Sequence, residues 1–148
     1  MSNIYNIRAY AIFIQNNKVL LTDEYRVGMF MTKFPGGGLE AEEGLIDCVL
    51  RECKEEMNIE AKVKQHFYTT DFFIKSAFGK KEQLMSIYYL MEHQNEFGIS
   101  FVETKNEIPN IDGAQSFRWV DLKDFSDDDV TFSIDKIVAK KIKDIYAN

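Results

Sequence analysis

Cysteine, proline and histidine are scarce in this chain of 148 residues, with two of each. Two cysteines are too few for a disulfide scaffold. Cys48 and Cys53 lie about 140° apart around a predicted helix, so we expect no bridge between them. His66 and His93 form no cluster with cysteine, and the sequence has no CxxC pair, which excludes the usual zinc motifs.

The chain also lacks a long apolar run and an excess of positive charge. No segment approaches the roughly 20 apolar residues that span a membrane, and the first residues show no basic-then-apolar signal pattern. We therefore expect no membrane partner and a cytoplasmic location. The formal net charge of −6 argues against a protein that coats nucleic acid, although a small anionic substrate can still bind locally.

What the chain does contain is the composition of a folded protein, with 45% apolar and 14% aromatic residues. The simplest arrangement is a single domain over residues 1–148, which is long enough to bury a full core. No internal repeat, low-complexity stretch or linker interrupts it.

Alternating segments predict strands, and segments with a period of 3.6 predict helices. The predicted strands cover residues 3–15, 18–23, 63–74, 84–91, 99–102 and 115–120. The predicted connections include a tight turn at Asn16-Asn17, a loop at 25–33 and a hairpin connection at 76–83. Helices are predicted at residues 44–57 and 133–146, with Ser133 as a candidate N-cap of the second. This order indicates an α/β fold, a mixed sheet with helices packed against it.

The most informative segment runs from a proline-glycine turn at residues 34–38 into the helix at 44–57. Glu52, Glu55 and Glu56 lie at i, i+3 and i+4, so they share one helical face. Such crowded carboxylates repel one another unless a cation neutralises them, and a hard divalent ion with oxygen ligands fits this need. The alternative is a solvated acidic face without function.

This segment resembles the Nudix box, G-x5-E-x7-R-E-U-x-E-E-x-G-U, in which U is a bulky apolar residue. The match needs no insertion, and its members are Gly37, Glu43, Arg51, Glu52, Cys53, Glu55, Glu56 and Ile59. A solvated acidic face would explain neither the glycine turn nor the offsets of Glu43 and Arg51. The one departure is Asn58 in place of glycine. It falls just past the helix end, where asparagine is the next best left-handed residue.

The resemblance implies a Nudix-type α/β/α sandwich with a mixed β-sheet between helices. It also implies an enzyme, a pyrophosphohydrolase that uses a divalent metal to split a diphosphate linkage in a nucleoside diphosphate derivative. The substrate would be a small nucleotide, such as a nucleoside triphosphate, a nucleotide sugar or ADP-ribose, and the base and leaving group stay open. Dimers are frequent in the family, so a homodimer is also open. The alternative function is a non-catalytic Nudix-fold module that senses a nucleotide, although such modules usually lose acids from the box.

By resemblance, Glu52, Glu55 and Glu56 would bind Mg²⁺, or Mn²⁺ as a substitute, with the Gly37 carbonyl as a further ligand. Glu52 is the leading candidate for the general base that activates water. Arg51 would pair with Glu43 or Glu55 and so orient the carboxylates.

Candidates outside the box rest on weaker patterns. A further catalytic acid would come from the loop at 108–114, where Asp112 is the best positional candidate, with Glu107 and Glu103 as alternatives. Asp112 equally suits an Asp-Gly turn. The remaining candidates would bind substrate: Lys33 and Arg8 as phosphate contacts, and Phe30 as an aromatic ring on the base, with Tyr68, Phe72 and Phe73 as further rings. Core or sheet packing is the alternative for these rings.

Overall fold

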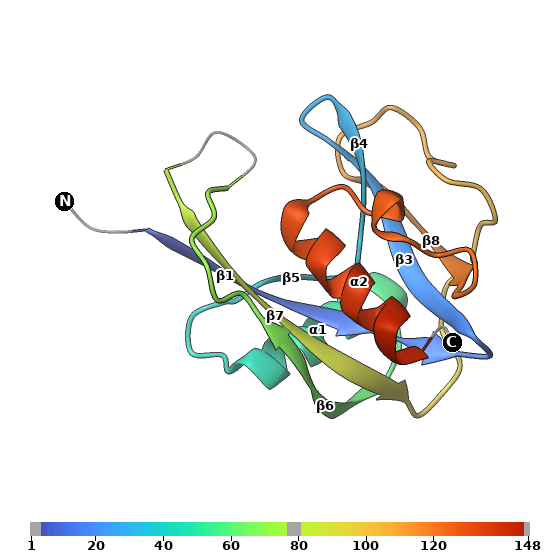
Figure 1. Cartoon of the computed structure of the whole chain (residues 1–148), viewed down its shortest axis with the longest axis horizontal. Coiled ribbons are helices and arrows are strands. Elements are labelled where there is room, and N and C mark those ends of the chain that lie inside the picture. Colours follow the sequence, from blue (N-terminus) through green and yellow to red (C-terminus); the bar gives the residue numbers. More distant parts are fainter. Residues whose placement is uncertain (1–3, 77–80, 147–148) are drawn as a thin grey trace. The chain divides into compact units, whose positions relative to one another are not determined.

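The computed structural model describes residues 4–76 and 81–146. The chain forms two compact units, the first made of Met1–Ile12 and Gly36–Gly98 and the second of Phe13–Pro35 and Ile99–Asn148. Each unit has its own sheet and one α-helix (Figure 1).

The first unit contains the mixed sheet that the sequence predicts, in the order β5-β1-β7-β6. β1 (Tyr5–Ile12) runs parallel to β7 (Gln83–His93) and antiparallel to β5 (Gly36–Gly38). β6 (Ala61–Thr69) pairs antiparallel with β7 and forms the other edge. The predicted strand at 63–74 is therefore confirmed in its first part but ends earlier, at Thr69.

The helix of the first unit, α1 (Leu45–Met57), packs against β1, β5 and β6. The apolar residues that recur at helical spacing on its packed face, Val49, Cys53 and Met57, are buried together with Cys48. Ile46 has the same spacing, but 49% of it is exposed, because it lies in the first turn of the helix. The predicted helix is thus confirmed, and Gly44 precedes it as the N-cap.

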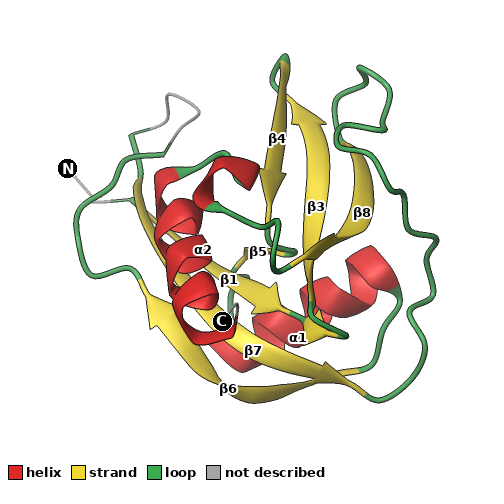
Figure 2. Cartoon of the chain, turned by 45° about the vertical axis from the view of Figure 1, so that its right-hand side comes forward, coloured by secondary structure: helices red, strands yellow, loops and turns green. Residues whose placement is uncertain are grey.

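The second unit contains an antiparallel sheet in which β3 (Lys18–Arg26) is central (Figure 2). β3 pairs with β2 (Ile14–Gln15), β4 (Met29–Lys33) and β8 (Ala114–Asp121). Asn16 and Asn17 have φ angles of 52° and 60°, as the predicted tight turn between two strands requires. The predicted strand at 3–15 is divided, because Phe13 separates β1 from β2.

The predicted loop at 25–33 is wrong, because β3 continues to Arg26 and β4 begins at Met29. Only Val27 and Gly28 remain between the strands, both with positive φ. A valine is strained in that conformation, so the turn gives no ordinary sequence signal. The edge-to-face contact between Tyr25 and Phe30, with ring centroids 4.9 Å apart, stabilises the hairpin instead.

The C-terminal helix of the second unit, α2 (Ser133–Tyr146), is confirmed at its predicted bounds, although Ser133 is its first residue rather than its cap. A 3₁₀ helix, η1 (Asp127–Asp129), precedes it and was not predicted. Residues 99–102 do not form the predicted strand, although Val102 N donates to the Phe117 carbonyl of β8 at 2.9 Å.

One predicted connection lies partly outside the described residues. The predicted hairpin connection at 76–83 includes residues 77–80, which lie outside the described residues, while Lys75 and Gln83 next to them form an antiparallel bridge. Within residues 4–76 and 81–146, we find no helix with both the length and the apolar character needed to cross a membrane.

Candidate functional site

The predicted glycine turn is a short strand, β5, whose glycines allow unusually close contacts. Gly36 has φ of +151°, and a side chain there would collide with the Ala9 carbonyl oxygen on β1. A Cβ on Gly37 would lie 2.6 Å from the Glu52 carboxylate atoms. The absence of a side chain at Gly37 therefore lets this carboxylate rest directly on the strand.

The two ends of α1 fix where its acids lie. Gly44 N donates to Asp47 Oδ2 at 3.0 Å at the N-terminus. At the C-terminus, Asn58 has φ of 48° and its backbone N–H donates to the Lys54 carbonyl at 3.0 Å. The predicted left-handed conformation of Asn58 is confirmed, so the helix ends in register although the family glycine is missing.

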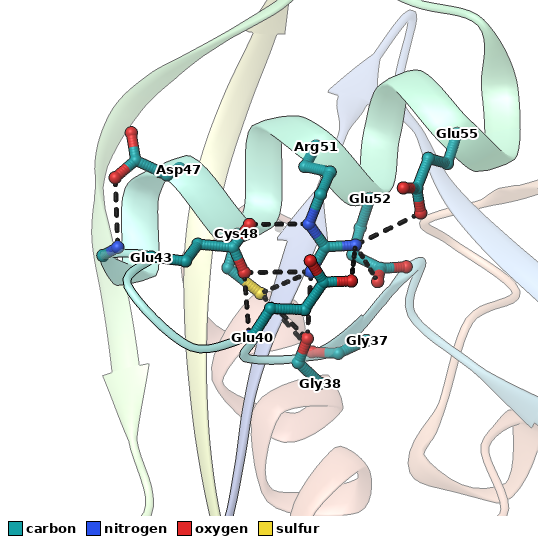
Figure 3. A network of polar contacts seen from close by, with 10 residues as sticks. Gly37, Gly38, Glu40, Glu43, Asp47, Cys48, Arg51, Glu52 and Glu55 are labelled. Carbon is teal, nitrogen blue, oxygen red and sulfur yellow. Dashed lines mark hydrogen bonds and ion pairs between the residues drawn. The ribbon is translucent and has the colours of Figure 1, made fainter.

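Arg51 makes a bidentate ion pair with Glu43 (Figure 3). Its Nε and Nη2 lie 2.6 and 2.9 Å from the two Glu43 oxygens, and Nη2 also donates to the Gly38 carbonyl at 3.0 Å. These bonds lower the pKa of Glu43 to about 2, chiefly through Arg51 and secondarily through the Glu40 N–H. The same bonds raise the pKa of Arg51. Arg51 and Glu43 are therefore both charged at neutral pH.

Arg51 also reaches the acids of α1 through Nη1. This nitrogen lies 2.8 Å from Glu52 Oε1, 3.2 Å from Glu55 Oε2 and 3.6 Å from Glu40 Oε1. The sequence left open whether Arg51 pairs with Glu43 or Glu55, and the structure shows both pairs. One guanidinium thus offsets the repulsion among several carboxylates.

The remaining acid of the box, Glu56, faces the glycine strand. Its Oε2 accepts a hydrogen bond from Gly36 N at 3.1 Å. Glu52 and Glu56 therefore both contact β5, one at the Gly37 Cα and the other at the Gly36 N–H. Glu55 is the most exposed of the three, with 58% of its side chain accessible.

This donor set fits a hard divalent cation. The candidate donors are all oxygens: three carboxylates and the Gly37 carbonyl. Arg51 engages one oxygen of Glu52 and one of Glu55, so the second oxygen of each is available to a metal. In the part of the chain that the structure describes, no three His, Cys, Asp or Glu side chains already converge at metal-binding distances. Binding would therefore require the carboxylates to turn toward the ion.

The two cysteines are free and buried. Cys48 Sγ donates to the Gly38 carbonyl at 3.5 Å, and burial raises the pKa of its thiol to about 11. Burial also raises the pKa of Cys53. Both thiols therefore stay protonated at neutral pH and pack as apolar side chains.

Of the candidates outside the box, Arg8 lies in the same unit as the box. It pairs with Gly38 in the ladder between β1 and β5, and its Nε donates to the Tyr10 hydroxyl at 2.6 Å. Tyr10 was not identified from the sequence, because a strand tyrosine carries no pattern that distinguishes a bonded hydroxyl from core packing.

Lys33 lies in the second unit, where its Nζ is 3.3 Å from Glu24 Oε2. Only 4% of the Glu24 side chain is exposed, and Arg26 Nε and Gln115 Nε2 also bond to it. The sequence reasoning missed Glu24. The available signal was a charged residue in the interior of an apolar strand.

Phe30 and Asp112 also lie in the second unit. Phe30 is 37% exposed and packs on Tyr25, while Asp112 Oδ1 accepts a hydrogen bond from Val27 N at 2.9 Å. Glu107, an alternative to Asp112, accepts bonds from Thr104, which lower its pKa. Asp112 thus stabilises the turn between β3 and β4.

The similarity to the family is not confined to the box, because a model of the NUDIX domain matches residues 5–141. The chain belongs to the NUDIX family. No curated protein matches this NUDIX chain in sequence.

Solved structures resemble the chain over nearly its full length. The ORF135 protein of E. coli aligns with a TM-score of 0.73 at 16% identity, covering 98% of this chain and 93% of that one. A MutT NUDIX hydrolase from Burkholderia pseudomallei aligns with a TM-score of 0.68 at 21% identity, covering 93% and 97%. The MutT protein from Methanosarcina mazei Go1 gives 0.69 at 16% identity, covering 97% and 96%. At such identities the likeness shows the fold alone, and the predicted α/β Nudix fold is confirmed.

Proposed function

We propose that this NUDIX protein is a hydrolase that uses a divalent metal to split a diphosphate linkage in a nucleoside diphosphate derivative. The observation that carries the proposal is the complete acid set on α1, with Glu52 and Glu56 against the glycine strand and Arg51 bridging to Glu55. A solvated acidic face would not require a carboxylate packed on the Gly37 Cα.

Mg²⁺, or Mn²⁺ as a substitute, would be bound by the candidate oxygen donors of the box: Glu52, Glu55, Glu56 and the Gly37 carbonyl. A bound ion of this kind neutralises charge that builds on the phosphate oxygens and lowers the pKa of a coordinated water. Glu52 would accept the proton of the attacking water as its oxygen bonds to phosphorus and the bridging P–O bond breaks. Only 16% of the Glu52 side chain is exposed, so the base is shielded from bulk solvent.

Arg51 would act by holding the carboxylates rather than by touching the substrate. Its bonds to Glu43, Glu52 and Glu55 fix three side chains relative to one another. Outer-shell partners of this kind typically change metal affinity or activity by about 10- to 100-fold.

The substrate contacts outside the box stay predictions. Arg8, Lys33 and Phe30 are proposed to bind the nucleotide, and Lys33 would then exchange its Glu24 contact for a phosphate. Of the two roles open for Asp112, a further catalytic acid or a turn residue, we propose the turn role, because its Oδ1 accepts the hydrogen bond from Val27 N.

We propose a small nucleotide as substrate and a cytoplasmic site of action, with neither nucleic acid nor membrane as partner. One structural neighbour is described as a UDP-X diphosphatase, at 16% identity and covering 62% of that chain, and others as MutT proteins. Both descriptions make nucleotide sugars and nucleoside triphosphates reasonable test compounds. Whether the protein forms a homodimer can be measured by sedimentation.

The deciding experiment is a substrate panel with Mg²⁺ or Mn²⁺ and identification of the products, which shows which P–O bond breaks. Glu55→Gln and Glu56→Gln should lose most turnover and keep the fold, because amides are weaker metal ligands of nearly the same shape. Glu60→Gln is the matched control, since Glu60 pairs with Lys54 outside the acid set. Equal rates for all four proteins would reject the assignment. Tight calorimetric binding of a nucleotide without any product would instead support the non-catalytic module.

A further inference from the structure

Arg8 and Tyr10 form a bonded pair on one face of β1. Residues two apart in a strand point to the same side of the sheet. Arg8 Nε donates to the Tyr10 hydroxyl at 2.6 Å, and the guanidinium carbon lies 5.6 Å from the centre of the Tyr10 ring. The hydroxyl therefore fixes the plane of the guanidinium.

Tyr10 itself is held in place by the sheet. Only 7% of Tyr10 is exposed, and its ring stacks on Tyr88 with centroids 5.2 Å apart and an angle of 25° between the planes. Tyr88 is 1% exposed. Because both rings are buried, they cannot serve as a platform for a nucleobase, but they can hold the Tyr10 hydroxyl rigidly toward Arg8.

The pair directs Arg8 to the glycine strand. Arg8 is the ladder partner of Gly38, and its Nη1 lies 3.5 Å from the position that a Cβ on Gly38 would take. The neighbouring Gly37 meets the Glu52 carboxylate in the same way. Successive residues of a strand face opposite sides, so β5 has a cation on one face and the box acids on the other.

β5 is the outermost strand of its sheet, and none of its residues carries a side chain. Gly36 and Gly37 are buried, whereas Gly38 and Arg8 are partly exposed, so a phosphate would reach Arg8 at the Gly38 end of the strand. Arg51 is unsuited to this contact, because its nitrogens already donate to Glu43, Glu52 and Glu55. A guanidinium held at a fixed angle is well suited to phosphate.

We propose that Tyr10 is a positioning residue that aims Arg8 at a phosphate group of the nucleotide, on the face of β5 opposite the Nudix-box acids. This inference rests on the proposed function for the identity of the ligand. Arg8 is the group that touches the ligand, and Tyr10 acts through it.

The probe is inorganic pyrophosphate in the presence of Mg²⁺, with its dissociation constant measured by calorimetry. Tyr10→Phe keeps the stacked ring and removes the hydroxyl, so affinity should fall roughly tenfold, as expected for loss of a hydrogen bond to a charged group. Tyr146→Phe is the matched control, because Tyr146 is the last residue of α2 in the second unit, is 38% exposed and has no proposed role in binding. With the best substrate of the panel, KM should rise by a similar factor and kcat should change little.

A double-mutant cycle separates positioning from a structural role. In an Arg8→Ala background, Tyr10→Phe should produce no further loss of pyrophosphate affinity. An equal loss in both backgrounds, or an equal loss with Tyr146→Phe, would overturn the proposal. If Tyr10→Phe does not fold, Arg8→Lys replaces it, since it keeps the charge but lacks the Nε–H donor. A protein that hydrolyses nothing in the panel refutes the proposed function, while the pyrophosphate series still decides the role of Tyr10.

Discussion

Glu43 shows how a single box residue can contribute to stability without touching the substrate. Both of its oxygens accept bonds from Arg51, and Oε1 also accepts a bond from the Glu40 N–H. The charged form is therefore favoured in the folded protein, and its pKa falls from 4.5 to about 2. A depressed pKa of this kind links the stability of the fold to pH.

We predict that part of the free energy of unfolding is present above pH 4.5 and is lost as the pH falls from 4.5 to about 2, because Glu43 binds a proton more readily in the unfolded chain. Glu43→Gln should remove this contribution, so the free energy of unfolding should change less with pH between 4.5 and about 2. Urea unfolding at a series of pH values measures it, with Glu60→Gln as the control. Parallel curves for Glu43→Gln and the unmodified protein would contradict the prediction.

Asp112 has a structural contact that a catalytic acid does not need. It accepts a hydrogen bond from Val27 N in the two-residue turn between β3 and β4. We predict that Asp112→Ala lowers the free energy of unfolding by about 1 kcal/mol and leaves kcat unchanged. Asp112→Asn should keep most of the stability, because its carbonyl still accepts the bond. A large loss of kcat in both variants, with normal stability, would show that Asp112 is catalytic instead.

At the scale of elements, the end of α1 explains how the chain tolerates asparagine in place of the family glycine. The Asn58 side chain lies against Gly98, whose N–H donates to the Met57 carbonyl at 3.1 Å. A Cβ on Gly98 would lie 2.6 Å from Asn58 Nδ2 and 2.8 Å from Asn58 Cβ. The asparagine therefore depends on a second glycine, distant in sequence.

We predict that Gly98→Ala destabilises the protein by about 1–3 kcal/mol, as expected for overpacking. Asn58→Gly removes the obstructing side chain, so it should rescue Gly98→Ala while having little effect alone. Thermal unfolding of both single variants and the double variant measures the coupling. Additive effects in the double variant would show that the two residues do not compete for space.

Helices and hairpins of this chain differ in how well the sequence predicts them. The helix at 44–57 follows from its apolar stripe, because Val49, Cys53 and Met57 recur at helical spacing. The hairpin of β3 and β4 does not, because its turn places Val27 at positive φ and relies on Asp112, far away in sequence. Periodicity reports one face of one element, whereas this turn depends on a tertiary contact.

The candidate site likewise contains residues that a local motif predicts and contacts that only the folded structure shows. The box acids follow from a local motif, and the structure places all of them in one unit with Arg51. The burial of Glu24 beside Lys33 could not be predicted, because it depends on packing between two strands. The bond from Arg8 to the Tyr10 hydroxyl could not be predicted either, because it depends on the conformations of two side chains on one face of a strand. A charged residue in an apolar strand indicates that it has a partner, but the sequence does not show which residue that partner is.

At the scale of the whole molecule, metal binding should be visible as a gain in stability. An ion that binds only the folded chain adds about 2.7 kcal/mol at a hundredfold excess over its Kd. We predict that Mg²⁺ raises the Tm and that EDTA reverses the change. Glu56→Gln should abolish the effect and Glu60→Gln should keep it. A Tm that is independent of Mg²⁺ in the unmodified protein would contradict the prediction.

The three glycines of β5 should respond very differently to saturation mutagenesis. Every side chain at Gly36 meets the Ala9 backbone carbonyl, which cannot move aside, so this position should be as intolerant as the acids themselves. A side chain at Gly37 meets the end of the Glu52 side chain, so it would displace that carboxylate rather than break the strand. Gly38 faces the end of Arg8 at ordinary contact distance, so alanine fits there. A mutational scan would thus mark Gly36 as essential for reasons of space alone. Intolerance in such a scan therefore does not identify a residue that performs chemistry.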